Sequence, residues 1–315
     1  MPRNDPTLPS MKLAGVIVTY NPPSGLADRV RAVLAQTDFV VIVDNGSATA
    51  PDLGALPAEL HSRVQLIRNA SNIGLAAALN QGISLGRDLG ASAALLLDHD
   101  SLPQPGLVAA LCAARAGPAA EAPIAVRVPA IRYAHPDIAC RWPSSSGHRG
   151  PCFHFVYAAQ LRAPTPVDLA IGSGMLVDVA AWERIGRFDE GLFIDLVDTE
   201  FCLRARAKGY QIVAVPGPAL QHELGAVTRR RLLGVPVFPT HHSATRHYYI
   251  NRNRITLARR YARVFPGWLA YELLGAIKLA IKALLFETDR LTKLRYMVRG
   301  TLAGLQGHSG PMPSK

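Results

Sequence analysis

The chain has 315 residues, of which 49% are hydrophobic and 18% are charged, and its formal net charge is +11. This composition excludes a disordered or fibrous chain and is sufficient for a large buried core. The four cysteines form no Cys-x-x-Cys pair, which argues against a zinc site or a disulfide framework and predicts reduced thiols in a cytosolic setting. Segment 1–10 lacks the basic and apolar parts of a signal peptide, so we expect a chain that is not exported.

The positive charge is concentrated at the C-terminal end. Residues 1–225 contain 18 basic and 20 acidic residues, whereas residues 226–315 contain 16 basic and only 3 acidic residues. A block of this kind favours nucleic acid, anionic lipid or polyphosphate partners, without selecting one of them.

The first two-thirds of the chain alternate predicted strands and helices. Short apolar, β-branched runs predict strands, and helical spacing is found in residues 28–35 and in the alanine-rich stretch that ends near Leu89. This alternation predicts an α/β fold with a mostly parallel central sheet and helices on both faces. The four predicted strands are residues 13–20, 39–43, 64–67 and 93–97.

The pattern becomes irregular between residues 123 and 166, where prolines and serines separate short β-like runs. A strand-like run, a short helix at 182–185 and an amphipathic helix at 198–208 follow, and a last strand at 212–215 is expected to end at Pro216.

From about residue 226 the sequence predicts a basic, aromatic and largely helical extension. Its stretch 264–286 is long and apolar, but Glu272, Lys278 and Lys282 interrupt it, and the uncharged part is too short for an ordinary membrane span. Two interpretations stay open: an amphipathic helix that lies on a membrane surface, or a helix that packs on its own domain.

Three polar turns follow predicted strands. They are Asp44-Asn45-Gly46-Ser47, Asn72-Ile73-Gly74 and Asp98-His99-Asp100. In parallel sheets ligands bind beyond the carboxyl ends of the strands, and two carboxylates one residue apart suit a Mg²⁺ or Mn²⁺ ion that neutralises a diphosphate. Each turn alone also fits a solvated turn or a helix cap, but three on one sheet edge favour a nucleotide site. Neither a P-loop nor a Gly-x-Gly-x-x-Gly motif is present.

These motifs, together with several later ones, resemble family 2 inverting glycosyltransferases with the GT-A fold, of the rhamnosyltransferase type found in bacterial surface polysaccharide assembly such as that of O-antigen. The resemblance covers about residues 13–260. The later matching motifs are Gly172-Ser173-Gly174, Phe188-Asp189-Glu190, residues 193–200 and residues 246–254.

The resemblance implies a catalytic domain at 11–225, with a donor-binding half at 11–122 and an acceptor half at 123–225, followed by the extension at 226–315. It also implies a role for each matching residue. Asp100 and His222 would hold a Mg²⁺ or Mn²⁺ ion, although His222 also fits a surface histidine. The other implied ligands are Thr19, Tyr20, Asp44, Asn72, Gly74, Asp98 and Arg252 for the donor, and Gly174, Asp195 and Tyr249 for the acceptor.

Inversion by direct displacement needs one general base for the acceptor hydroxyl. The family carries it as an aspartate at the start of a helix, usually after a glutamate. Here Val197 replaces that glutamate and the aspartate is Asp198, our candidate base. Asp195 and Glu200 lie nearby and leave the assignment open, and all three also fit acids favoured by a helix N-terminus.

The expected function is transfer of a sugar to a saccharide or lipid-linked acceptor at the inner face of the cell membrane. The resemblance implies L-rhamnose from dTDP-L-rhamnose. A UDP-hexose donor is the alternative within the fold, and a basic nucleic-acid-binding protein is the alternative from another class. The apolar stretch of the extension argues against nucleic acid. A nucleotidyltransferase is disfavoured because residues 21–25 lack a basic residue.

Overall fold

The computed structural model describes residues 11–115, 122–145, 151–222 and 227–313. Two predictions fall outside these ranges: the character of segment 1–10, and the domain boundary between residues 225 and 226. Both stay predictions.

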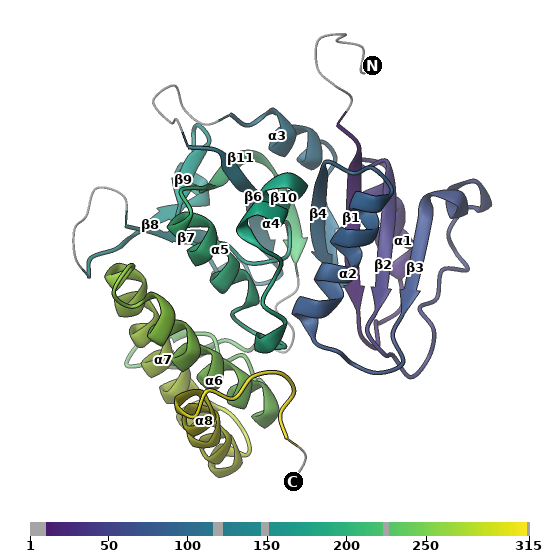
Figure 1. Cartoon of the computed structure of the whole chain (residues 1–315). Coiled ribbons are helices and arrows are strands. Elements are labelled where there is room, and N and C mark those ends of the chain that lie inside the picture. Colours follow the sequence, from purple (N-terminus) through teal and green to yellow (C-terminus); the bar gives the residue numbers. More distant parts are fainter. Residues whose placement is uncertain (1–10, 116–121, 146–150, 223–226, 314–315) are drawn as a thin grey trace.

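A central sheet organises the first two-thirds of the chain (Figure 1). Eight of its nine described strands lie side by side in the order β3-β2-β1-β4-β10-β6-β11-β5, and the ninth, β9, pairs with β11. The first four strands are parallel, so their carboxyl ends meet at one edge. The predicted strands are confirmed as β1 (Leu13–Thr19), β2 (Phe39–Asp44), β3 (Val64–Arg68) and β4 (Ala93–Asp98).

The second half of the sheet is mixed. Strand β10 is antiparallel to both β4 and β6, while β6 and β11 are parallel to each other. The prediction that the last strand ends at Pro216 was wrong. The pairing of β11 with β6 shifts register between Val215 and Leu220 and then continues to His222, because a proline removes a ladder donor without ending the strand. The strands are β5 (Ser101–Pro103), β6 (Ile124–Tyr133), β9 (Thr165–Val167), β10 (Leu176–Asp178) and β11 (Gln211–His222).

Helices cover both faces of the sheet, as predicted. A buried cluster of apolar residues lies on each face of the sheet. One cluster packs against α2, α4 and α5, and the other packs against α1 and α3. Valine, leucine and alanine fill both clusters, which is typical of a sheet buried on both sides. These helices are α1 (Leu26–Leu34), α2 (Leu75–Asp88), α3 (Leu107–Ala113), α4 (Val179–Ile185) and α5 (Val197–Ala207).

The region predicted as irregular, 123–166, contains the long strand β6 and a separate two-stranded sheet. Strands β7 (Arg141–Ser144) and β8 (His154–Tyr157) form that sheet. Short 3₁₀ turns lie between these elements: η1 (Ala58–Arg63), η2 (Ala158–Gln160) and η3 (Glu190–Leu192).

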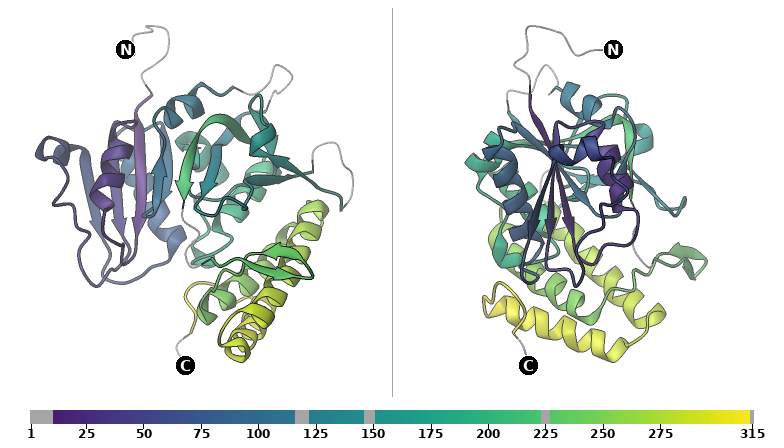
Figure 2. Two further views of the ribbon diagram at one scale, coloured as in Figure 1. Left: turned by 180° about the vertical axis from the view of Figure 1, so that it is seen from behind. Right: turned by 90° about the vertical axis from the view of Figure 1, so that its right-hand side faces the viewer.

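The C-terminal extension is largely helical, as predicted, but it opens with a hairpin. Strands β12 (Arg230–Leu232) and β13 (Val235–Val237) pair across Leu233 and Gly234, which both have positive φ. Three helices follow: α6 (Ala244–Tyr261), α7 (Pro266–Phe286) and α8 (Arg290–Leu305). Figure 2 shows them at the end of the sheet toward which β1 and β2 run. Gly300 and Gly304 of α8 lie directly on the backbone of α6, so α6 and α8 form one packed unit.

Candidate active site

The carboxyl ends of β1, β2 and β4 bring three of the predicted residues together. Thr19 pairs with Asp44 in the parallel ladder, and the neighbouring Val18 pairs with Asp98. Thr19 and Asp44 are fully buried, and the Thr19 hydroxyl lies 3.4 Å from Oδ1 of Asp44. Tyr20 is 48% exposed at the rim of this edge. The predicted gathering of polar residues at one sheet edge is therefore present.

The turn after β2 is fixed by its own hydrogen bonds. Asp44 accepts hydrogen bonds from the backbone N–H and the hydroxyl group of Ser47, and it forms an ion pair with Arg68. Gly46 has a φ of +83°, and a Cβ there would lie 2.5 Å from the backbone of Ser71. The turn after β2 thus packs against the turn after β3, and only glycine permits this contact.

Asn72 joins these two turns and does not cap helix α2. Its Oδ1 accepts hydrogen bonds from Asn45 Nδ2 at 3.1 Å and from the Gly74 backbone at 2.9 Å. The helix is capped by Gly74, whose φ is +92°, and its first N–H groups donate to the carbonyl of Phe193. Asn72 and Gly74 therefore lie beside the segment that precedes α5.

Asp98, Asp100 and His222 form a three-residue cluster. Each offers one ligand atom, and these atoms lie within 4.8 Å of one another. The three residues come from the end of β4, the turn after it and the end of β11. Oδ1 of Asp100 lies 3.2 Å from Nδ1 of His222, yet this buried oxygen receives no well-aligned hydrogen bond from the described residues. An oxygen of this kind is suited to a cation.

Two serines position the cluster. Ser101 Oγ lies 2.6 Å from Ser173 Oγ and 3.0 Å from His222 Nδ1, and Ser173 Oγ accepts a hydrogen bond from the Asp98 backbone. Ser173 belongs to a motif that the sequence shows, whereas Ser101 has no such signal, because only the pairing of β5 with β11 brings Ser101 beside His222.

The electrostatics of the two carboxylates differ. Burial raises the pKa of Asp98, although the charge of His222 opposes that effect. Burial also acts on Asp100, but the contact with His222 and its charge outweigh it and lower the pKa of Asp100.

Asp198 lies at the first turn of α5, facing the same edge. Its Oδ2 accepts the Gly172 N–H at 2.8 Å, and its Oδ1 accepts the Thr199 N–H at 2.7 Å. Burial raises the pKa of Asp198, and the charges of Asp195 and Asp98 raise it further. A carboxylate that is fixed by backbone donors, with a raised pKa, is suited to proton transfer.

Glu200, by contrast, faces away from this edge. It is 1% exposed and binds Arg204 and the Tyr261 hydroxyl. Asp198 and Glu200 therefore point in different directions.

The segment before α5 has an unusual backbone. Phe193, Asp195 and Leu196 all have positive φ, a conformation that costs free energy in residues other than glycine and persists where the surroundings impose it. Helix α6 supplies those surroundings, because Asn253 Nδ2 donates to the carbonyls of Leu192, Ile194 and Asp195 at 2.8–3.0 Å.

Arg252, Tyr249 and Gly174, three of the predicted ligands, are buried in contacts with other parts of the chain. Arg252 is 1% exposed, and its guanidinium donates to the carbonyls of residues 191, 192 and 310. Tyr249 is 5% exposed, stacks on Phe193 and accepts the Met312 N–H. Gly174 is buried with a φ of +89°, next to Leu220 and Pro129. Helical spacing does not reveal which face of α6 meets the site.

Arg246 is the arginine of α6 that faces the site. Its guanidinium is 45% exposed and pairs with Asp195 at 3.0 Å. Its charge also stabilises ionised Asp98, so it acts on the acidic cluster. Beside Asp100 and His222 a cavity of about 600 Å³ opens, with Arg29 and Arg132 in its lining.

A parallel sheet edge that combines nucleotide-type turns, an acidic cluster and a fixed carboxylate defines a nucleotide-sugar transferase of the GT-A type. Comparisons with known proteins agree. Residues 16–171 match the family described as Glycosyl transferase family 2. This match confirms the resemblance found in the sequence.

One relative matches along nearly the whole chain. The dTDP-rhamnosyl transferase RfbF of Shigella flexneri is 28% identical over 304 residues, which are 94% of this chain and 95% of that protein. The enzyme class expected from the sequence, a rhamnosyltransferase-like glycosyltransferase, is thereby confirmed.

Solved structures confirm the fold. GalNAc-T7 with UDP, GalNAc and Mn²⁺ matches with a TM-score of 0.57 and 17% identity, covering 82% of this chain and 49% of that one. Staphylococcus aureus TarS matches with a TM-score of 0.50 and 15% identity, covering 88% and 44%. This chain therefore spans about half the length of these two solved chains.

Proposed function

We propose that the protein transfers L-rhamnose from dTDP-L-rhamnose, with inversion, to a saccharide or lipid-linked acceptor. The observation that carries the proposal is that Asp198, in the first turn of α5, lies close enough to Asp98 of the cluster Asp98, Asp100 and His222 for the two charges to interact. The full-length similarity to the Shigella flexneri dTDP-rhamnosyl transferase supports the donor.

The nucleoside is assigned to the turns at the ends of β1, β2 and β3. Thr19, Tyr20 and Asp44 would line the base, and Asn72 and Gly74 would approach the nucleotide. Asp98, at the end of β4, would contact the ribose. The buried hydrogen bonds of these turns support a rigid, preformed pocket.

Asp100 and His222 would hold a Mg²⁺ or Mn²⁺ ion, with Asp98 close by. The donor set fits, because the buried Oδ1 of Asp100 lacks a well-aligned hydrogen bond from the described residues and carboxylate oxygens are ligands that both ions accept. Such an ion neutralises the charge that gathers on the leaving diphosphate. Arg246 would bind the diphosphate as a second cation, the donor-binding role that the sequence predicted for Arg252.

Asp198 would act as the general base. Its carboxylate accepts the proton of the acceptor hydroxyl as that oxygen attacks the anomeric carbon. The bond from this carbon to the diphosphate oxygen breaks, and its electron pair leaves with the diphosphate. Asp195, next to Arg246, would orient the acceptor. We further propose that the enzyme works at the inner face of the cell membrane.

A donor panel tests the proposal. Purified protein with Mg²⁺ or Mn²⁺ should release dTDP from dTDP-L-rhamnose in the presence of an acceptor, and chelation should abolish release. Turnover of UDP-hexoses without turnover of dTDP-L-rhamnose would overturn the donor assignment and leave the enzyme class intact.

A further inference from the structure

Helices α7 and α8 present their apolar side chains to solvent. Eleven large hydrophobic residues on these two helices are 38–83% exposed. On α7 they are Leu273, Leu274, Ile277, Ile281, Leu284 and Leu285, and on α8 they are Leu291, Leu294, Val298, Leu302 and Leu305. We call these eleven side chains the α7–α8 face.

The spacing of these residues places them on one side of each helix. Their separations of three, four, seven and eight residues follow the helical repeat, so each set forms a single stripe.

The inward side of each of the two helices carries a buried charged residue among small and apolar ones. Glu272 of α7 is 7% exposed and pairs with Arg254, and Lys293 of α8 is 5% exposed and pairs with Glu287. Both helices therefore bury charged residues and expose leucines, the reverse of a surface helix in water. A contiguous apolar surface of this kind marks an interaction site.

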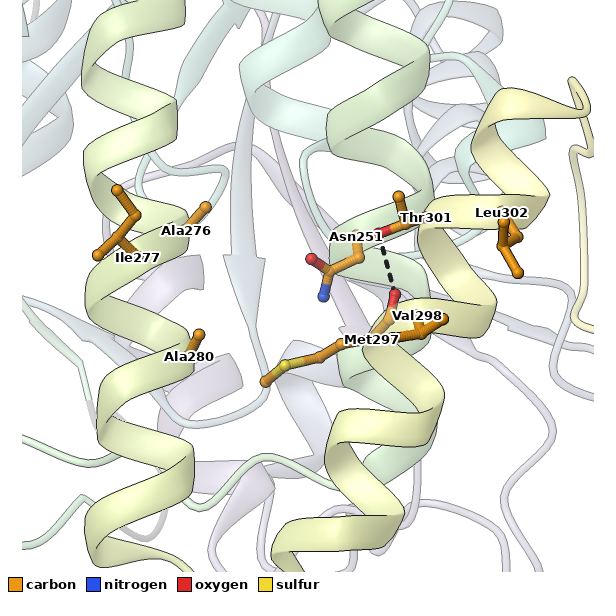
Figure 3. A pocket seen from close by; sticks show the side chains of 8 residues that line it. All are labelled: Asn251, Ala276, Ile277, Ala280, Met297, Val298, Thr301 and Leu302. Carbon is orange, nitrogen blue, oxygen red and sulfur yellow. Dashed lines mark hydrogen bonds between the residues drawn. The ribbon is translucent and has the colours of Figure 1, made fainter.

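The two stripes border one groove, which Ile277 of α7 and Val298 and Leu302 of α8 line. Figure 3 shows Ala276, Ile277 and Ala280 of α7 across from Met297 of α8. The groove has a volume of about 390 Å³, and Asn251 and Thr301 are its few polar lining residues. The face is thus one surface rather than two separate helices.

Charge identifies the partner. The exposed charged residues on α7 and α8 are Lys278, Arg290 and Arg295, with Asp289 the exposed acid in the linker. A cationic rim around an apolar face matches an anionic lipid surface, whereas two copies of the face would bring like charges together. None of the helices that the structure describes has the length and apolarity to cross a membrane.

We propose that the α7–α8 face docks the protein onto an anionic bilayer, with the apolar side chains inserted among the lipid headgroups. This proposal rests on the membrane location that the proposed function includes, and it names the surface that would make the contact. The packed helix α6 carries both Arg246, at the site, and the contacts with α8, so docking would fix the sheet edge near the lipid.

Vesicle flotation tests the docking surface. The full chain should float with vesicles of phosphatidylcholine and phosphatidylglycerol, and much less with phosphatidylcholine alone. Ile281→Asp combined with Leu302→Asp should reduce the bound fraction at least tenfold. The matched control is Leu66→Asp, because Leu66 is 45% exposed on the edge strand β3, far from the face, and this variant should float like the parent.

Other outcomes would overturn the proposal. Equal flotation of the double variant and the parent would remove the face as the lipid contact, and so would a parent that does not float. A parent dimer in light scattering that the double variant abolishes, without lipid binding, would assign the face to a second copy. Circular dichroism checks that the double variant is folded. If it is not, the milder double variant Ile281→Asn and Leu302→Asn replaces it in the flotation experiment. A parent that floats but releases no dTDP from dTDP-L-rhamnose, with either a saccharide or a lipid-linked acceptor, would contradict the proposed reaction and leave the docking surface unaffected.

Discussion

Arg246 and Asp195 form an ion pair, with Nη2 of the arginine 3.0 Å from Oδ1 of the aspartate. The pair joins the first turn of α6 to the backbone segment that precedes α5. The two side chains differ in exposure, 45% for Arg246 and 10% for Asp195, so the arginine is accessible to a ligand. An arriving diphosphate would compete with Asp195 for this guanidinium.

The first prediction concerns Arg246. Arg246→Met should weaken donor binding by about 10–100-fold, because a hydrogen bond to a charged group contributes about 1.5–3 kcal/mol. Isothermal titration with donor and metal measures this. Arg260→Met is the control, because Arg260 also lies on α6, is 46% exposed and pairs with Asp189, away from the site. Equal losses in the two variants would contradict a specific role for Arg246.

The second prediction concerns the candidate base. Asp198→Asn should lower kcat by about 10²–10⁴-fold, the usual contribution of a general base, while donor affinity changes little. Asparagine removes the buried charge but offers one acceptor oxygen where Asp198 has two, so either the Gly172 or the Thr199 N–H loses its acceptor, and kcat should be compared on folded protein after Tm has been measured. Near-normal kcat in Asp198→Asn, with a large loss in Asp195→Asn, would transfer the role to Asp195.

The third prediction is a pH profile. The base acts when ionised, and burial raises the pKa of Asp198 above that of an ordinary aspartate. Activity should therefore fall as the pH drops through this raised pKa, at a higher pH than a solvent-exposed carboxylate would give. The pH dependence of kcat, measured with the metal saturating, checks it. An acid limb that persists unchanged in the residual activity of Asp198→Asn would belong to another group.

The sequence predicted the sheet edge well for a physical reason. Apolar runs end abruptly at Thr19, Asp44 and Asp98, and parallel strands bring such ends together. The sequence could not show which residues of α6 face the site. Arg246 and Arg252 lie on different sides of one helix, and only tertiary packing decides that Arg252 binds loop carbonyls.

Long-range pairing explains what else escaped prediction. Ser101 reaches His222 because β5 pairs with β11, although 121 residues separate them. The sequence also could not predict that the leucines of α7 are exposed, because an apolar stripe has the same sequence pattern whether it faces a protein core or a bilayer.

The fourth prediction concerns the metal. Asp100→Ala and His222→Ala should each weaken Mn²⁺ binding about tenfold or more, measured by titration of the protein with Mn²⁺ and no donor. His99→Ala is the control, because the described ligand cluster consists of Asp98, Asp100 and His222 and does not contain His99. Unchanged Mn²⁺ affinity in both test variants would remove this cluster as the metal site.

The last prediction concerns Asn253, which acts through the segment before α5. Its amide donates to three carbonyls of residues 192–195, a segment with strained backbone that leads directly into the helix of Asp198. Asn253→Ala removes this donor. The Leu192 carbonyl still accepts from Arg252, but the carbonyls of Ile194 and Asp195 lose their bonds to Asn253, which should cost about 1–3 kcal/mol of unfolding free energy. The substitution should also lower kcat in the folded protein, because the carboxylates of Asp195 and Asp198 lose their fixed positions.

A purely structural role for Asn253 makes a different prediction. In that case Tm would fall while kcat and KM of the folded fraction stayed normal. Asn251→Ala serves as the control, since Asn251 lies on the same helix and donates to the carbonyl of His247 instead. A loss of kcat in Asn253→Ala with unchanged Mn²⁺ affinity, absent in Asn251→Ala, would establish that α6 holds the catalytic segment in its strained conformation.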